Sequence, residues 1–466
     1  MKNISIQLKR MILSLVLFLS LFIAGSCDSF VDVPPPNSQL TGITVFADNT
    51  TATAAMKDIY AKMRDTGLLS GRSLGLSNVL GQYTDELLCY QTGINSPEPF
   101  FNNALDATNG PVLEMWNATY NQIYAANAVI AGVNASTALT SAQKNQLVGE
   151  ALFVRAMLHS YLAGLFGSCP YITTTDYELN SLVSRQPKAQ VYANCIDDLL
   201  QAETLLGPAY VAPNRARPNV FAVKALLARL YLYNSQWAEA SNAASAVLNE
   251  TGTYVWETDL NKVFLKGCKT TIWQFAPGTI FPNSQEGPTF IFNAGPPTVT
   301  SLSPAFYAAF EAGDQRQVKW TRTITSGSNT WYHAYKYKQG TGVTTSTEHS
   351  IILRLAEQYL IRAEARARLG ELTNAKQDLN FIRNTAGLGN TPANTATEIL
   401  DAVLQERRFE LFTELGHRFF DLQRFGKLDI MLTPVKPGWN TTDALWPVPQ
   451  AELLINPNLL PQNAGY

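Results

Sequence analysis

Apolar residues recur every three or four positions through several long segments of the chain. In residues 145–166 the apolar series is Leu147, Ala151, Val154, Leu158, Tyr161 and Leu165. Such spacing places the apolar side chains on one face of an α-helix, and Gly167 and Pro170 are residues that would end it. Residues 116–133 and 191–206 follow the same pattern, so the chain is predicted to be mostly helical.

Two other segments have the form of helical hairpins. Residues 220–233 and 237–248 are Ala-rich and separated by a short polar turn, and residues 353–369 and 372–383 repeat that arrangement around Gly370. Their lengths and Ala positions resemble tetratricopeptide units of about 34 residues. Because the copies lie far apart in the sequence, we expect a helical scaffold with insertions rather than a continuous solenoid. Ordinary helical hairpins are the alternative.

The segment from Trp273 to Tyr337 has a different composition. It is dense in aromatic residues, and Pro and Gly recur throughout residues 276–297. This density of helix-breaking residues excludes a long helix there and predicts short strands and long loops. Loops on a rigid scaffold often carry binding sites, so we expect a ligand site in this aromatic, loop-rich region.

The first thirty residues have the features of an export signal. Lys2, Lys9 and Arg10 precede an apolar run over residues 11–23. That run is shorter than the roughly 20 residues that span a bilayer, but it is typical of a signal peptide. Cys27 follows three small residues, as in a bacterial lipoprotein signal, so we predict that Cys27 is lipidated. The alternative is an ordinary signal peptide in which Cys27 has no role.

The overall composition narrows the possible functions. With 35 Lys and Arg against 37 Asp and Glu, the net charge is -2, which argues against a nucleic-acid partner because that partner needs a basic face. The other cysteines are Cys89, Cys169, Cys195 and Cys268. None of them forms a CxxC pair, so no metal site is predicted. An export compartment permits disulfides, but we favour buried free thiols.

Motifs that would carry catalysis are weak. Residues 71–75 match GxSxG, but that motif requires a strand before the serine, and residues 63–67 do not have the pattern of a strand. His159 lies within a helical pattern and is expected in the core. No P-loop, HExxH or GxGxxG is present, so neither a cofactor nor a metal is predicted. The abundant carboxylates leave a glycosidase pair open, and with it a surface glycoside hydrolase, as the alternative function.

The densest charged segment of the chain is residues 406–424. Charged residues alternate there with large apolar ones on a predicted helix, which favours partly buried, bidentate ion pairs with a structural role. Glu414 and Arg418 are four residues apart in the favourable acid-before-base order, so we expect them to pair. The residues assigned to this structural signature are Glu406, Arg407, Glu410, Glu414, Gly416, Arg418 and Asp421.

The same segment resembles the signature of the SusD/RagB family, which consists of outer-membrane lipoproteins of Bacteroidetes-type bacteria. The family pattern is E-R-R-x-E-L, a Glu and Gly-His-Arg, and then two aromatics before Asp-Leu. Residues 406–424 match it, with Leu415 as a variant in the spacing. Elsewhere the chain departs slightly from the family pattern, with Cys169 where a small apolar residue is usual and Ala464 where Pro is common. Further matches are Cys27-Asp28, Arg155-Ala156, Phe166-Gly167, Trp446-Pro447-Val448-Pro449, Asn456-Pro457-Asn458-Leu459 and Gln462-Asn463-Ala464-Gly465-Tyr466.

The resemblance implies a mostly α fold: a tetratricopeptide-like helical hairpin scaffold, with four hairpins, and a loop-rich, aromatic-rich subdomain containing short strands. It implies no catalysis and no cofactor. It also implies a lipid-anchored protein of the outer membrane that faces the cell surface and works with a TonB-dependent transporter of the SusC type. The expected divisions are a signal peptide at 1–26, a tether at 27–40, an N-terminal helical region at 41–265 and a C-terminal region at 266–466.

The resemblance further implies an oligosaccharide ligand, or a peptide in some relatives. An aromatic face suits a sugar because the C–H patches of a pyranose need a flat apolar partner, and nearby polar groups fix the hydroxyls. No family motif carries the contact positions, and core or loop packing is the alternative role for each candidate. The candidate ligand contacts are Tyr83, Asp85, Trp273, Phe281, Trp320 and Trp331.

Overall fold

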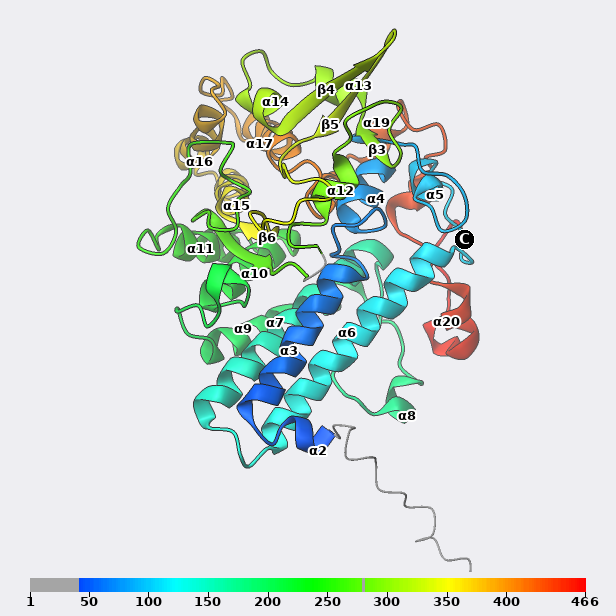
Figure 1. Cartoon of the computed structure of the whole chain (residues 1–466), viewed down its shortest axis with the longest axis vertical. Helices are drawn as coiled ribbons and strands as arrows, with labels where there is room; N and C mark the ends of the chain where they lie inside the picture. Colours follow the sequence, from blue (N-terminus) through cyan, green and yellow to red (C-terminus); the bar gives the residue numbers. More distant parts are fainter. Residues whose placement is uncertain (1–41, 279–280) are drawn as a thin grey trace, which may run out of the picture. The chain divides into compact units, whose positions relative to one another are not determined.

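Helices make up most of the chain (Figure 1), as the hydrophobic periodicity predicts. The computed structural model describes residues 42–278 and 281–466. The mostly α fold class is confirmed, and each long helix predicted from the apolar spacing is present. The long helices are α3 (Asn49–Asp65), α6 (Gly110–Ala135), α7 (Ser141–Phe166), α9 (Lys188–Leu205), α10 (Val220–Tyr233), α11 (Trp237–Leu248), α15 (Leu355–Arg368), α16 (Leu372–Thr385) and α17 (Ala396–Glu410).

Some predictions concern residues outside the described part of the chain. They are the signal peptide at 1–26, the lipidation of Cys27 and the tether at 27–40. The chain divides into two units, Met1–Val45 and Phe46–Tyr466. Of the first unit the structure describes the short helix α2 (Gly42–Val45). The predicted boundary between residues 265 and 266, within the second unit, stays a prediction.

Polar caps set where the long helices begin. The Thr140 hydroxyl accepts a hydrogen bond from the Gln143 amide, and the Gln143 side chain accepts one from the Thr140 amide. This capping box satisfies two backbone donors at the start of α7. The first turn of α7 is polar, so the helix begins before the apolar series that predicts it. A second capping box, at Thr395 and Glu398, begins α17.

The two predicted hairpins pack directly on each other. α10 and α11 have the predicted bounds, and α15 and α16 form the second hairpin. α11 lies against α15, although residues 249–354 separate them in the sequence. The pairs α3/α6, α7/α9, α10/α11 and α15/α16 therefore follow one another in a continuous row. Side chains at the contact between the two hairpins include Ala228, Leu232, Ala240, Ala244, Ile361 and Ala365.

α7 is buried all round rather than on one face. Every side chain from Leu147 to Phe166 is buried, because α3, α6, α9 and α10 all pack against this helix. Its charged residues are consequently paired: Arg155 donates to Asp198 at 2.6 and 2.7 Å, and Arg217 donates to Glu150. Burial of this kind is tolerated when each charge meets a hydrogen-bonded partner.

His159 of α7 is a core residue, as expected. Its Nδ1 lies 2.9 Å from the Arg155 carbonyl, and its Nε2 accepts the Ile172 amide at 3.0 Å. One ring nitrogen therefore donates and the other accepts, which is the pattern of a neutral imidazole. Burial lowers the pKa of His159 to about 3, so the ring does not act as a proton carrier near neutral pH.

Short strands are present in the aromatic, loop-rich segment as predicted, but the two small antiparallel sheets also include β1 and β6, which lie outside that segment. One sheet has the order β1-β3-β5-β4, and the other pairs β2 with β6. In Figure 1 the β4–β5 hairpin extends from the top of the molecule, away from α3 and α6. The strands are β1 (Leu87–Cys89), β2 (Thr271–Phe275), β3 (Thr300–Leu302), β4 (Thr321–Ser326), β5 (Asn329–Ala334) and β6 (Ser350–Arg354).

The loop-rich region has a core of its own, made largely of aromatic rings. Trp320, Phe306 and Phe310 pack there with Phe409 and Phe412, which lie on and just after α17. This core joins the loops to the helical scaffold. Short helices complete the chain: α4 (Leu76–Tyr83), α5 (Glu98–Phe101), α8 (Tyr177–Asn180), α12 (Glu286–Phe290), α13 (Pro304–Ala308), α14 (Gln315–Trp320), α18 (His417–Arg424), α19 (Leu428–Leu432), α20 (Gln450–Ile455), and the 3-10 turns η2 (Pro213–Arg215), η3 (Thr441–Ala444) and η4 (Pro457–Leu459).

Buried ion pairs connect α17 to the loop-rich region. Arg316 of α14 lies 2.6 Å from Glu406 and 3.1 Å from Glu410. Arg354, at the end of β6, lies 2.6 Å from Glu410 and 2.7 Å from Glu414. Arg316 also pairs with Asp314 at 2.8 Å, so each guanidinium meets two or three carboxylates away from water. Loss of one partner would leave an uncompensated buried charge.

The remaining signature residues are also interior. Arg407 donates to Asp421 at 2.7 Å, and Arg424 donates to the same carboxylate at 2.8 Å. Gly416 has a φ of 75°, and a Cβ on it would lie 2.1 Å from Leu80 Cδ1. Both the left-handed backbone and the lack of space require glycine at this position.

The predicted pair between Glu414 and Arg418 is not formed. α17 ends before these residues and α18 begins between them, so a spacing of four no longer corresponds to one helical turn. Glu414 instead contacts Lys336, and Arg418 pairs with Asp85 at 2.9 Å. Residues with positive φ in this connection are Thr413, Leu415 and Gly416.

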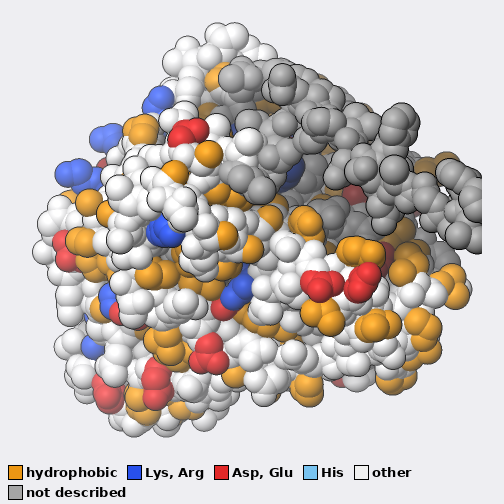
Figure 2. Space-filling view, turned by 90° about the horizontal axis from the view of Figure 1, so that it is seen from below, with side chains coloured by type: hydrophobic (Ala, Val, Ile, Leu, Met, Phe, Trp, Pro, Cys, Tyr) orange, Lys and Arg blue, Asp and Glu red, His pale blue; other side chains and the backbone are white. Residues whose placement is uncertain are grey.

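Cys89, Cys169, Cys195 and Cys268 are free thiols, and all except Cys89 are buried. This agrees with the expectation of buried free thiols for three of the four. No helix among residues 42–278 and 281–466 combines the length and hydropathy that a bilayer crossing needs. On the face that Figure 2 shows, acidic, basic and hydrophobic side chains are interspersed.

Candidate ligand-binding surface

Three of the predicted ligand contacts lie in the core. The side chains of Tyr83, Trp273 and Trp320 are 0% exposed. Trp273 packs edge-on against Phe153, with ring centroids 5.0 Å apart, and Trp320 donates its indole N–H to the Leu260 carbonyl at 2.8 Å. A ring without accessible surface offers no face to a sugar, so these three residues are corrected from ligand contacts to core residues.

Asp85 is held in an ion-pair cluster instead of facing a ligand. Its carboxylate accepts hydrogen bonds from Arg418 at 2.9 Å and from Arg408 at 2.8 Å. Burial alone would raise the pKa of Asp85, but the charges of Arg418 and Arg408 outweigh burial, and the pKa is lowered. The carboxylate is thus ionised and engaged, and its role is corrected to a structural ion pair.

Phe281 is 55% exposed and lies at the edge of a hollow of about 290 Å³. The hollow is formed by residues 281–288 on one side and 340–344 on the other. Asn283 fixes the first side: it donates to the Thr345 carbonyl at 2.9 Å and accepts the Thr347 amide at 2.8 Å. The exposed ring therefore stands on a loop that hydrogen bonds hold in place.

Trp331 does not belong to that hollow. It lies on β5, opposite Ile324 of β4, and is half-buried. Its ring covers Gly295 so closely that a Cβ there would lie 2.0 Å from it. Trp331 thus packs the hairpin against the Pro- and Gly-rich loop, and its ligand contact stays a prediction.

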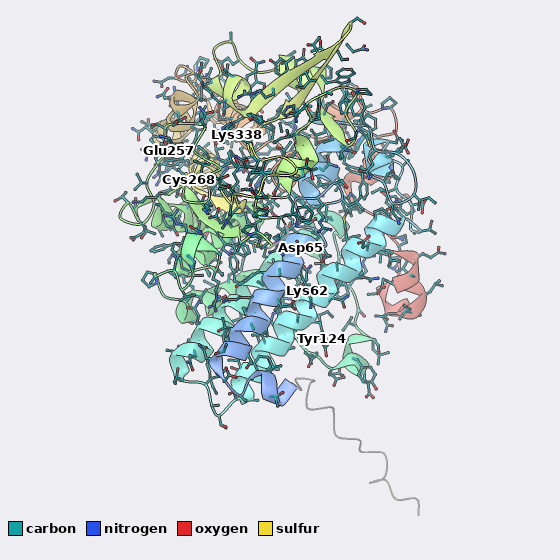
Figure 3. The ribbon with its side chains drawn as sticks, viewed as in Figure 1. Lys62, Asp65, Tyr124, Glu257, Cys268 and Lys338 are labelled. Carbon is teal, nitrogen blue, oxygen red and sulfur yellow. The ribbon has the colours of Figure 1, made fainter. Side chains whose placement is uncertain are left out.

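A second hollow, of about 180 Å³, lies between residues 65–74 and 111–115. Gln285 belongs to the loop that lines the first hollow and bonds to two residues of the second. Its amide donates to Asp65 at 2.6 Å, and its carbonyl accepts from Arg72 at 3.1 Å. We call the two hollows together the loop surface. Figure 3 labels Asp65 at the end of α3, beneath the loop-rich region.

The loop surface combines a ring with polar groups of fixed orientation. Arg72 is exposed, and its Nε donates to Gln285. Asp65 accepts from Arg64 at 2.9 Å. Burial would raise the pKa of Asp65, but the hydrogen bond and charge of Arg64 outweigh it and the pKa is lowered. Asp65 is therefore suited to accept a hydrogen bond and unsuited to give up a proton.

Glu286 lies directly beneath this surface and explains the glycine of the GxSxG match. A Cβ on Gly71 would lie 2.5 Å from the Glu286 carboxyl. Glu286 can therefore approach residue 71 this closely only because residue 71 has no side chain. Ser350 donates to Glu286 at 2.6 Å, and burial raises the pKa of Glu286 to about 7. Residues 71–75 form a loop before α4. The strand that a nucleophile elbow requires before the serine is therefore not present at this position.

Arg72, Gln285 and Asp65 were not identified from the sequence. Arg72 lies inside the rejected GxSxG match, and Gln285 is more than 200 positions from both of its partners. No local pattern signals such a pairing. Among residues 42–278 and 281–466, no three His, Cys, Asp or Glu side chains are grouped so as to hold a metal ion.

Comparison with known proteins matches two parts of the chain to two SusD-type families. Residues 307–466 match the SusD family, and residues 29–232 match a family described as starch-binding and associating with the outer membrane. SusD-like protein P2 of Formosa agariphila is 27% identical over 89% of this chain and 92% of its own length.

Solved structures show the same fold. A SusD superfamily protein from Bacteroides vulgatus is 20% identical, with a TM-score of 0.79 over 91% of this chain and 100% of that one. Surface glycan-binding protein A from Bacteroides thetaiotaomicron, solved with laminarihexaose, is 19% identical, with a TM-score of 0.75 over 89% of this chain and 99% of that one. The structural likeness, at 20% identity or less, shows the fold, and on the two family matches and the SusD-like relative the chain belongs to the SusD/RagB family.

Proposed function

We propose that this protein is a surface lipoprotein that binds an oligosaccharide at the loop surface without cleaving it and passes it to a TonB-dependent transporter of the SusC type. The observation that carries the proposal is the exposed ring of Phe281, on a loop whose Gln285 accepts a hydrogen bond from the exposed Arg72. A flat apolar face next to fixed hydrogen-bonding groups is what a pyranose requires.

The oligosaccharide class is supported by the family. One matched family is described as starch-binding, and one protein of similar fold was solved with laminarihexaose. Release to a transporter requires modest affinity, so we expect dissociation constants between micromolar and millimolar, or roughly 4–8 kcal/mol. Peptides are the alternative ligand within the family.

Binding without turnover agrees with the electrostatics of the surface. A glycosidase needs a carboxyl group that donates a proton to the leaving group. Asp65 has a lowered pKa and is bound by Arg64, while Glu286, whose pKa is raised, is buried beneath the surface and accepts from Ser350. Neither carboxyl combines access to a ligand with a raised pKa.

The experiment that tests binding uses the purified full chain in detergent and three glucose hexasaccharides: laminarihexaose, maltohexaose and cellohexaose. Calorimetry should give binding to at least one of them, weakened about tenfold, or 1.4 kcal/mol, by Phe281→Ala and by Arg72→Ala. Phe381→Ala is the matched control, because Phe381 is a partly exposed ring on α16 that does not line the loop surface. Equal affinity in all variants would refute the site.

Chromatography of the same mixtures after long incubation should return intact hexasaccharide. Shorter products that disappear in a single carboxylate-to-amide variant would establish the hydrolase alternative. Binding of oligopeptides in place of all three sugars would establish the peptide alternative.

The anchor is tested separately. Cys27→Ala should abolish fatty-acid labelling and release the chain from the membrane fraction, because the apolar run before Cys27 is too short to retain it. Unchanged labelling would refute Cys27 as the lipidation site. If the chain passes its ligand to a SusC-type transporter, the wild-type chain should co-purify with such a transporter encoded beside it.

A further inference from the structure

A larger groove lies on another face of α6. It has a volume of about 400 Å³ and is bounded by α6, by residues 170–183 and by residues 452–459. We call it the α6 groove. The residues on which the following argument rests are Trp116, Asn117, Tyr120, Asn121, Tyr124 and Glu452.

Three aromatic rings follow one line along α6. Trp116, Tyr120 and Tyr124 are spaced four residues apart on one face of the helix, and the ring centroids of Trp116 and Tyr120 lie 4.8 Å apart. Trp116 is 3% exposed and Tyr124 is 50% exposed, while the Tyr120 hydroxyl is fixed by donating to the Pro170 carbonyl at 3.0 Å. The series runs from a buried ring to an open one, and Figure 3 labels the open ring on α6.

Unpaired amides accompany the rings. Asn117 and Asn121 each follow a ring by one residue, and both are exposed. Neither side chain forms a hydrogen bond with any other residue of the described chain. The opposite wall is fixed instead, since Asn456 donates to the Val183 carbonyl at 2.8 Å. The groove thus pairs rigid walls with free donors and acceptors.

We propose that the α6 groove is a second oligosaccharide-binding site, separate from the loop surface. Successive pyranose rings would lie against Tyr120 and Tyr124, with their hydroxyls bonded to Asn117, Asn121 and Glu452. The inference shares only its class of ligand with the proposed function, because none of these residues lines the loop surface.

A carbohydrate fits this groove better than a protein does. Exposed apolar side chains such as Ile455, at 74%, border the groove and would suit either occupant. An apolar protein face, however, would bury the amides of Asn117 and Asn121 without hydrogen-bond partners, which is unfavourable. The hydroxyls of a sugar chain would satisfy them.

Two sites on one chain predict a dependence on ligand length. A polymer that reaches both sites gains from effective concentration, whereas a short oligomer cannot. Laminarin should therefore bind the wild-type chain more tightly than laminarihexaose does, and the difference should shrink when either site is removed.

The test uses the full-length chain with Phe281→Ala and Arg72→Ala, titrated with the same three hexasaccharides. The binding that remains should fall about tenfold on adding Tyr124→Ala and return with Tyr124→Phe, which keeps the ring. Tyr177→Ala is the matched control, since Tyr177 is 76% exposed on α8 and does not line the groove. Thermal melting should be unchanged in all of these variants.

Several outcomes would overturn the second site. The proposal is wrong if the variant with Phe281→Ala and Arg72→Ala binds none of the hexasaccharides. It is also wrong if that variant still binds one and adding Tyr124→Ala does not weaken the binding. Loss of transporter co-purification in Tyr124→Ala, without loss of sugar binding, would identify the groove as a protein interface. A different result would show that the loop surface is not a binding site. In that case Phe281→Ala and Arg72→Ala would leave the affinity for the hexasaccharides unchanged, while Tyr124→Ala alone would weaken binding.

Discussion

The rings of residues 273–337 and the rings of α6 differ in what surrounds them. Trp273 and Trp320 come from the aromatic, loop-rich segment, yet both are fully buried. α6 has fewer rings, but its regular spacing carries them from the interior at Trp116 to the surface at Tyr124. Aromatic density in this loop segment therefore indicates mainly core rings, with Phe281 as an exposed exception, whereas the regular spacing on α6 brings rings to the surface beside exposed amides.

The difference has a physical cause. Loops lack the continuous backbone hydrogen bonds of a helix or sheet, so they depend on side chains for a fixed shape. In this chain the rings around Trp320 and the guanidinium groups of Arg316 and Arg354 fill that role. α6 is held by its own backbone, and its outward side chains are free for other contacts.

The largest expected effect on stability is the difference between removing a buried ring and removing a half-buried ring of the same region. Trp320→Ala should lower the free energy of unfolding by about 3–5 kcal/mol, because it leaves a cavity and an unpaired Leu260 carbonyl. Trp331→Ala should cost clearly less, since its ring is partly exposed on β5. Urea denaturation measures both values, and equal losses would contradict the division between core rings and surface rings.

The next effect separates a buried arginine from an exposed one. Arg418→Ala should destabilise the fold by roughly 3 kcal/mol, because it removes one of the two cations that face Asp85. Arg72→Ala should change stability by less than about 0.5 kcal/mol, since Arg72 is exposed. An Arg418 variant that melts like the wild type but no longer binds ligand would move Arg418 from the interior to the site.

A smaller effect depends on pH. Burial raises the pKa of Glu286 to about 7 from an ordinary 4.5, so the folded chain binds more protons than the unfolded chain between these values. The stability that this carboxyl contributes is present below pH 4.5 and is lost as pH rises through 7. Glu286→Gln should therefore be more stable than the wild type at pH 8, with a difference that shrinks towards pH 4.

Denaturation at several pH values checks this, with Glu239→Gln, an exposed residue on α11, as the control. A difference between Glu286→Gln and the wild type that stays constant from pH 4 to 8 would mean that Glu286 does not titrate in this range.

The smallest effect on stability is expected at the two open rings. Phe281→Ala and Tyr124→Ala should each change the free energy of unfolding by less than about 0.5 kcal/mol, although both weaken sugar binding. A large loss of stability in either variant would show that the ring supports the fold, and would assign it to the same group as Trp273.

The sequence predicts helices well and long-range contacts poorly. The bounds of α10 and α11 follow from apolar spacing and a polar turn, because these are local properties. The predicted pair of Glu414 with Arg418 is wrong, because Glu414 lies within the helix break at 411–416. Its actual partners, Lys336 and Arg354, come from distant segments. Arg72 and Gln285 meet for the same reason without any local signal. Phe281 could be proposed from composition, but its exposure could not.

The stacking of α11 on α15 also bears on how the chain can diversify. Residues 249–354 leave the scaffold at α11 and return to it at α15 (Figure 1), so their ends are held together whatever lies between them. The entropy of closing such an insertion grows only logarithmically, by about 0.6 kcal/mol for each doubling of its length. Changes in the length of the loops that carry Phe281 therefore cost little loop-closure entropy, while the row of helices beneath them folds as before.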